Sequence, residues 1–266
     1  MPVTLEAIAE RTRETVDAAR RERPLTAVQE QAEAAPAPRS LYDRMTSDDG
    51  SAHVIAECKR RSPSAGTIRA DFDAVDIALQ YENAGATGIS CLTDEPFFGG
   101  SLQDLTAIRD AVGLPVLRKD FLVDPYQIWE ARASGADAVL LIAELLDPLL
   151  LDELAGIAGS LGMTSLIELH GPDQLDKVLP RIDEGRLLGV NNRNLRTMKT
   201  DIRHVTSMLE DLADHLPRVV CESGIRSHDD IEALRSQGIR NFLVGESLLK
   251  QNHPGTALRT LMGGNG

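Results

Sequence analysis

The feature that most constrains this chain is a repeat of eight short apolar runs, each ending in polar residues and followed by a helical stretch. The spacing between runs leaves room for one strand, one helix and two loops, and largely apolar strands are typical of a parallel sheet covered by helices. Eight units favour closure into a (β/α)8 TIM barrel over an open doubly wound sheet. No GxGxxG follows the first run, which weakens the dinucleotide-binding alternative. The predicted strands cover residues 54–58, 88–92, 115–118, 138–143, 165–169, 187–190, 218–221 and 241–244.

Helices are predicted between the strands. Pro125 and Pro148 suit the first turn of a helix, where the missing N–H is not needed. Several glycines stand where the helices should stop. The predicted helices cover residues 75–83, 102–111, 125–134, 148–161, 173–179, 201–212, 229–237 and 257–262.

The first fifty residues differ from the repeat. Leu5, Ile8, Thr12 and Val16 recur at helical spacing with charged residues between them, which predicts an amphipathic helix. The proline-containing stretch 34–38 breaks any helix there. We therefore expect an N-terminal helical extension, residues 1–50, packed on a barrel formed by residues 51–266.

Composition excludes several classes of function. The chain has 266 residues, with 41 acidic and 28 basic side chains and a formal charge of −13, so it lacks the basic balance of a nucleic-acid-binding protein. Glu144 and Asp147 interrupt the most apolar run, which predicts no membrane association. Three well-separated cysteines without a CxxC pair indicate reduced thiols in a cytoplasmic protein.

Charged side chains stand at the carboxyl ends of the predicted strands, where TIM barrels carry their chemistry. Because side chains alternate along a strand, Glu57 and Lys59 share one face. The same alternation aims Lys119, Glu168 and Glu222 into the barrel. Burial lowers a lysine pKa while carboxylates raise it, and such opposed effects suit a general acid and a general base. The alternative is a set of structural ion pairs.

The last two strands end in glycine-containing loops, Ser223-Gly224 and Gly245-Glu246-Ser247. Barrels often bind phosphate at these loops, because glycine lets backbone N–H groups approach a ligand. The glycines would equally serve as turn residues. The histidines have no HxH or HxxxH spacing, so no metal site is expected. His170 is interpreted as a bystander.

Several of these stretches resemble the signature motifs of the indole-3-glycerol-phosphate synthase family. The resemblance extends from about residue 3 to 262. It implies that the enzyme closes the pyrrole ring of 1-(2-carboxyphenylamino)-1-deoxyribulose 5-phosphate, with loss of CO2 and water, in tryptophan biosynthesis, using no metal or organic cofactor. The motifs are Glu57–Ser64 (ECKRRSPS), Leu92–Glu95, Lys119–Phe121 with Asp124–Gln127, Gly189–Leu195, Glu222–Ile225 and Val244–Leu248.

The resemblance also implies roles for individual residues. Lys119 becomes the general acid and Glu168 the general base for the dehydration. Lys59 binds the anionic end of the substrate and takes part in proton transfer, Glu57 positions it, and Asn191 holds the reacting substrate. The other implied substrate contacts are Ser62, Arg193 and Glu222, with the phosphate taken by Ser223, Gly224, Gly245, Glu246 and Ser247.

Two rival functions remain at this point. A phosphate-binding barrel isomerase of the phosphoribosylanthranilate isomerase type would share the phosphate loops, but it would not need Lys59, Lys119 and Glu168 together. A non-catalytic phosphate-binding barrel would not need charged side chains at its mouth. The expected partners are a phosphorylated small molecule and other tryptophan-pathway enzymes. From Arg60 to Ser64 we expect a mobile lid over an anionic substrate.

Overall fold

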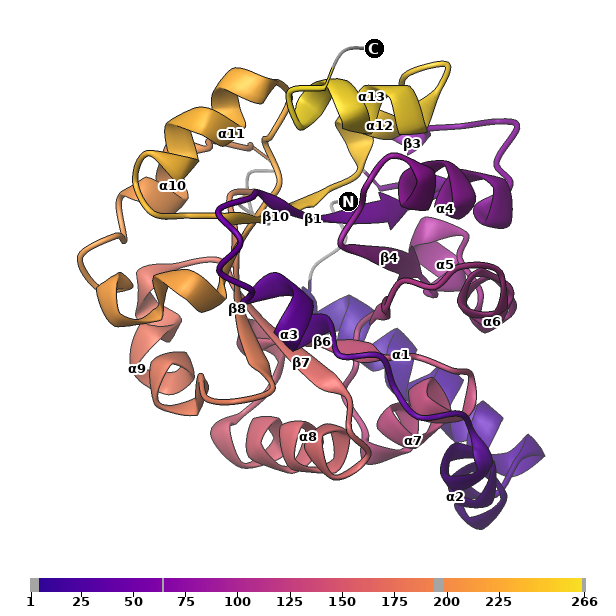
Figure 1. The fold of residues 1–266 in the computed structure, drawn as a ribbon. Coiled ribbons are helices and arrows are strands. Elements are labelled where there is room, and N and C mark those ends of the chain that lie inside the picture. Colours follow the sequence, from indigo (N-terminus) through magenta and orange to yellow (C-terminus); the bar gives the residue numbers. More distant parts are fainter. Residues whose placement is uncertain (1–4, 64, 194–198, 265–266) are drawn as a thin grey trace.

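The computed structural model describes residues 5–63, 65–193 and 199–264. Ser64 of the expected lid, and Asn194 and Leu195 of the motif after the sixth strand, lie outside the described residues. Eight parallel strands form a closed barrel, because the first strand pairs with both the last strand and the second (Figure 1). The predicted TIM barrel is confirmed. Its strands are β1 (His53–Cys58), β4 (Gly88–Leu92), β5 (Val116–Lys119), β6 (Ala138–Ile142), β7 (Thr164–Leu169), β8 (Arg186–Asn191), β9 (Val219–Glu222) and β10 (Asn241–Val244).

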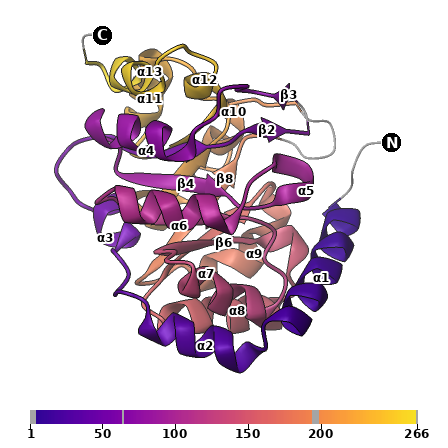
Figure 2. The same cartoon turned by 90° about the vertical axis from the view of Figure 1, so that its right-hand side faces the viewer.

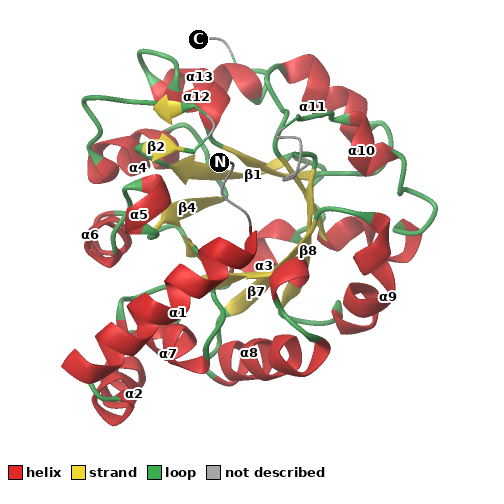
Figure 3. Cartoon of the chain, turned by 180° about the vertical axis from the view of Figure 1, so that it is seen from behind, coloured by secondary structure: helices red, strands yellow, loops and turns green. Residues whose placement is uncertain are grey.

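Helices surround the strands on all sides (Figure 3). Pro125 and Pro148 stand in first turns, as predicted, and Asp73 caps α4, because its side chain accepts hydrogen bonds from two N–H groups of the next turn. The outer helices are α4 (Ala74–Asn83), α6 (Leu102–Ala111), α7 (Pro125–Ala133), α8 (Pro148–Ser160), α9 (Leu175–Val178), α10 (Arg203–Thr206), α11 (His228–Arg235) and α13 (Pro254–Leu261).

Two predicted helices are shorter in the structure. The helix expected over 201–212 is reduced to α10, followed by turns. The segment expected over 173–179 divides into η2 (Pro172–Gln174), α9 and η3 (Leu179–Arg181), where Pro180 lacks the N–H that would continue an α-helix. The short elements not predicted are α5 (Glu95–Phe98), α12 (Glu246–Leu249), η1 (Ala143–Leu145) and η4 (Ala213–Arg218).

The two faces of each strand contribute to separate apolar clusters. Ile55, Leu117, Leu166 and Val220 belong to a cluster inside the barrel. Their neighbours in sequence pack outward against the helices, as Cys58 does. The predicted alternation is therefore correct, and the inward positions that follow these apolar residues are the ones that carry the charged groups.

The N-terminal extension contains α1 (Leu5–Glu22), α2 (Leu25–Ala34) and α3 (Leu41–Met45). Figure 2 shows it running from the face that carries the short strands β2 (Arg61–Ser62) and β3 (Gly66–Thr67), past α2, to α3 on the opposite face. The apolar stripe of α1 is buried at Ile8 and Val16, as predicted, and α2 ends where the proline stretch begins. The sequence prediction missed α2 and α3 as helices.

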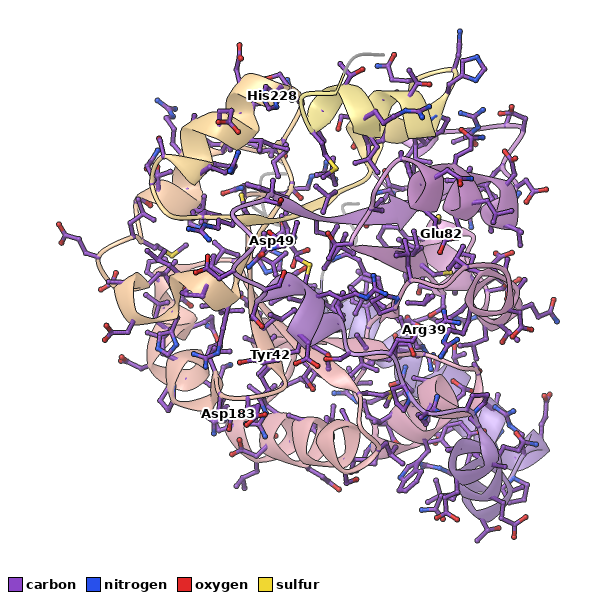
Figure 4. All side chains as sticks on the ribbon, viewed as in Figure 1. Arg39, Tyr42, Asp49, Glu82, Asp183 and His228 are labelled. Atoms are coloured by element: carbon purple, nitrogen blue, oxygen red, sulfur yellow. The ribbon has the colours of Figure 1, made fainter. Side chains whose placement is uncertain are left out.

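Helix α3 closes the end of the barrel opposite the mouth. Leu41 and Met45 are buried in the inner cluster, which stabilises the fold by ~2 kcal/mol each. Arg39 donates hydrogen bonds to the carbonyls of Val112 and Leu114, and the Tyr42 hydroxyl accepts one from Arg218. Arg39 and Tyr42 lie on the near face of the barrel in Figure 4. This end is structural, which leaves the opposite end for a ligand.

Among the described helices, none has the length and apolar character needed to cross a bilayer.

Candidate active site

One cavity of about 1750 Å³ opens at the carboxyl ends of the barrel strands. All thirteen site residues predicted from the sequence line it. The structure thus brings together side chains that are spread over most of the chain. They are Glu57, Lys59, Ser62, Lys119, Glu168, Asn191, Arg193, Glu222, Ser223, Gly224, Gly245, Glu246 and Ser247.

Lys119 is the centre of the buried charge in this cavity. Its Nζ donates to Glu168 Oε2 at 3.1 Å and to Glu222 Oε2 at 2.8 Å. The two carboxylates come from β7 and β9, and their side chains are 4% and 2% exposed. Alternation along β5, β7 and β9 puts all three side chains on the inner face, so closure of the barrel makes them meet.

The surroundings shift the proton affinities of this cluster. Burial disfavours the charged form of Lys119, but Glu168 and Glu222 outweigh it and raise the pKa of the ammonium. Burial also disfavours ionised Glu168, but the cation of Lys119 prevails and lowers the pKa of Glu168 to about 2. For Glu222, burial and the repulsion of Glu168 act together and raise the pKa to about 8. At neutral pH Glu168 is therefore ionised and Glu222 holds a proton, although both contact the ammonium of Lys119.

Two inward-facing glycines make room for the acidic side chains. A Cβ at Gly189 on β8 would overlap the carboxylate of Glu222, and a Cβ at Gly245 after β10 would overlap that of Glu57. Glu57 in turn accepts a hydrogen bond from Lys59, and both side chains are buried. Gly245 thus has a steric reason to be glycine, besides any contact with a phosphate.

The loop after β9 has an unusual backbone. Ser223 has φ of 64° and Gly224 has φ of 91°, and Ser223 is the one residue other than glycine with positive φ in the described chain. A serine in this region costs ~1 kcal/mol or more, and such strain is concentrated at functional sites. The buried Asn192 holds the loop, because its Nδ2 donates to the Ser223 carbonyl at 3.0 Å.

The loop after β10 begins α12. The Ser247 hydroxyl donates to the Ile225 carbonyl at 2.9 Å, so its proton is already used within the protein. A phosphate at this loop would therefore meet backbone N–H groups. Glu246 forms ion pairs with Arg193 at 3.1 Å and with Lys250 at 2.7 Å, which neutralise its negative charge beside this loop.

An apolar wall stands on the other side of the cavity. Phe98 of α5 and Phe121 after β5 lie with their ring centroids 6.1 Å apart, and Ile8 of α1 lines the same space. In the strand order of the barrel, β5 and β6 lie across from β9 and β10. The wall and the glycine loops are therefore on opposite sides of the barrel mouth, a distribution suited to an elongated ligand with an aromatic end and an anionic end.

Sequence reasoning did not assign a role to several residues of this cavity. His170, interpreted as a bystander, contacts Glu168, and its ring also contacts Glu144. The signal was present, since His170 follows Glu168 at the two-residue spacing of one strand face. Asn192 and the phenylalanine pair could not be found that way, because their partners are distant in sequence.

The expectation that Arg60 to Ser64 forms a lid concerns the loop after β1. Arg61 and Ser62 form β2, which pairs antiparallel with β3. The Arg61 guanidinium donates to the carbonyls of Glu95 and Pro96, which anchors this ribbon to α5 beside the cavity.

Within the described residues, no cluster of three or more His, Cys, Asp or Glu side chains is arranged to hold a metal ion.

Comparison with known proteins gives a consistent result. A family model described as indole-3-glycerol phosphate synthase matches residues 5–261. The chain is 53% identical to the indole-3-glycerol phosphate synthase of Rhodopirellula baltica over 79% of its length and 80% of the relative. It is 46% identical to that of Azoarcus sp. over 97% and 98%. Among solved structures, KGPDC from Streptococcus mutans matches with a TM-score of 0.60 at 15% identity, covering 79% of this chain and 95% of that one, which supports the fold alone.

Proposed function

The chain belongs to the indole-3-glycerol phosphate synthase family, and from that premise we propose how the groups at its barrel mouth divide the work of the reaction. Members of this family are decarboxylating lyases of tryptophan biosynthesis, and this chain is such an enzyme. The isomerase and the non-catalytic barrel are thereby set aside. The reaction converts 1-(2-carboxyphenylamino)-1-deoxyribulose 5-phosphate into indole-3-glycerol phosphate, with release of one CO2 and one water.

The substrate spans the cavity in this proposal. Its aromatic ring packs against Phe98 and Phe121, and its phosphate binds the N–H groups of the loops that contain Gly224 and Gly245. The observation that carries the proposal is the contact of the Lys119 ammonium with both Glu168 and Glu222 inside the cavity that these two regions line. The reacting carbon atoms of an elongated substrate would then lie beside the acid and the base.

Lys119 acts as the general acid. Its raised pKa keeps it protonated until the substrate arrives, and it gives a proton to the substrate carbonyl as the ring closes. Glu222, which holds a proton below about pH 8, lies 2.8 Å from the Lys119 Nζ and can return one. This transfer restores the ammonium of Lys119 and leaves Glu222 ionised, and the proton that Glu168 accepts in the dehydration returns the net charge of the cluster to its starting value, which matters in a buried site.

Glu168 acts as the general base of the dehydration. Its lowered pKa keeps it ionised at neutral pH, so it is ready to accept the proton that the ring must lose as water leaves. Lys59 binds the substrate carboxylate and takes part in proton transfer, with Glu57 holding its ammonium in place. Asn191 and Arg193 hold the substrate next to these groups, with Ser62 as a further contact.

Enzyme location is part of the same proposal. We infer that the protein works in the cytoplasm, and the three unpaired, buried cysteines support this inference because such thiols are usual in a reducing compartment.

The test is conversion of the carboxyphenylamino-deoxyribulose phosphate to an indole product, followed by indole fluorescence across a range of salt concentrations. Product formation is expected, and its absence at every salt concentration would refute the proposal. The variant Lys119→Ala should lose most turnover while still binding substrate. Unchanged turnover in this variant would remove Lys119 from the role of general acid.

A further inference from the structure

His170 lies between two carboxylates at the edge of the cavity. Its Nδ1 is 3.1 Å from Glu144 Oε2, and its Nε2 is 3.2 Å from Glu168 Oε1. Glu144 also accepts a hydrogen bond from the His170 backbone N–H at 2.7 Å. Glu144 therefore fixes both the backbone and the ring of His170, and the ring faces the carboxylate that we propose as the base.

The contact between the His170 ring and Glu168 is electrostatic. The His170 Nε2 is buried and has no hydrogen-bond partner among the described residues, because its 3.2 Å approach to Glu168 lacks hydrogen-bond alignment. Glu168 Oε1 thus faces the imidazole, while its Oε2 faces Lys119. This arrangement gives each oxygen of Glu168 a different neighbour.

The charged groups around the ring favour an imidazolium. Burial opposes the charge, but Glu144 of η1, Glu168 of β7 and Glu222 of β9 outweigh burial and raise the pKa of His170. On the remaining sides, the His204 Nε2 contacts the His170 carbonyl at 2.9 Å, and the Lys177 ammonium donates to the Ala143 and Leu146 carbonyls. None of these three contacts involves the His170 ring.

We propose that His170, held by Glu144, is a positioning residue that fixes the orientation and the ionised state of Glu168. The inference rests on the proposed role of Glu168 as the base and adds a second cation to the one that Lys119 supplies. With Oε1 held by the imidazolium, the carboxylate cannot rotate freely, and Oε2 stays directed at the reacting part of the substrate. Because Glu168 and Glu222 titrate as a pair, a positive charge on His170 also lowers the pH at which the pair loses its last proton.

The test compares His170→Gln with Glu144→Gln and with the control His204→Gln. Glutamine at 170 keeps an N–H donor but removes the positive charge. We expect kcat to fall about tenfold or more at unchanged KM, because the base is misplaced while the substrate contacts remain. We also expect the upper ionisation in the pH profile of kcat/KM, near pH 8 in the unaltered protein, to move to higher pH by about one unit.

Glu144→Gln keeps an oxygen acceptor for the His170 backbone and provides a second measurement if His170→Gln fails to fold. It should shift the ionisation in the same direction, and ring 15N NMR should show that His170 releases its proton at lower pH in this variant than in the unaltered protein. His204→Gln, which loses only a contact to the His170 carbonyl, should leave the ionisation in place.

Glu168→Gln tests the base assignment of Glu168 separately from the positioning role of His170. Turnover that survives in Glu168→Gln would overturn the base assignment itself. If Glu168→Gln is inactive while His170→Gln retains both the kcat and the pH profile of the unaltered protein, the role of His170 is wrong and the base assignment stands. An upper ionisation that moves equally in His204→Gln would also overturn the role of His170.

Discussion

Replacing Lys119 with methionine should destabilise the protein in a way that depends on pH. Methionine keeps most of the apolar stem but leaves the buried carboxylates of Glu168 and Glu222 without the ammonium that lies 3.1 Å and 2.8 Å from them. Breaking a buried pair by removing one partner costs ~3–5 kcal/mol, since a charge is left in the interior. We expect the unfolding free energy at pH 8 to fall by about 3 kcal/mol.

The sign of the pH dependence follows from Glu168. In the variant, the cation that lowers its pKa is gone and burial remains, so its folded-state pKa rises above the ordinary value of 4.5. A carboxyl with a raised pKa binds more protons in the folded state, so stability is retained at low pH and lost as pH rises through the folded-state pKa. At 1.4 kcal/mol per unit of pKa, the penalty at pH 5 should shrink to about 1 kcal/mol.

The measurement is urea unfolding at pH 5 and pH 8, followed through the single tryptophan, Trp129, and by circular dichroism. The control is Lys250→Met, which removes an ammonium 2.7 Å from Glu246 at an exposed site. It should cost less than ~0.5 kcal/mol at either pH. A penalty for Lys119→Met that is the same at both pH values, or no larger than that of the control, would refute the argument.

Three further predictions concern activity. Because Glu222 ionises above about pH 8 and then repels an anionic substrate, kcat/KM should decline above that pH. Glu222→Gln should abolish the decline. A decline that persists in this variant would show that another group causes it. Ser223→Asp should raise KM at least tenfold in steady-state kinetics, because its charge repels the substrate phosphate. Ser223→Asn, which tolerates the same left-handed backbone without a charge, should leave KM unchanged. Equal effects of the two variants would point to backbone strain as the cause. Gly189→Ala should lower kcat ~100-fold, because the new Cβ displaces the Glu222 carboxylate. The control Gly156→Ala, with nothing within 4 Å of the new Cβ, should keep full activity. A fully active Gly189→Ala would show that the position of Glu222 is unimportant.

The strands could be predicted because their signal is local. Eight apolar runs at regular spacing specify buried parallel strands, and two-residue alternation specifies which side chain faces inward. Lys119, Glu168 and Glu222 were found in this way, each from its own strand. The proline stretch also marked the end of α2 correctly. The short helices α3 and α5 gave no comparable signal, since four or five residues are too few for a helical period.

The strands, the faces of their side chains and, through the motifs, the family follow from the order of the amino acids. Which inward groups meet depends on the tertiary structure, because closure of the barrel joins side chains more than one hundred positions apart, as with Lys119 and Glu222. It also decided their proton affinities, since burial and neighbouring charge act through space. For the same reason, only the folded chain shows that His170 lies between the carboxylates of Glu144 and Glu168.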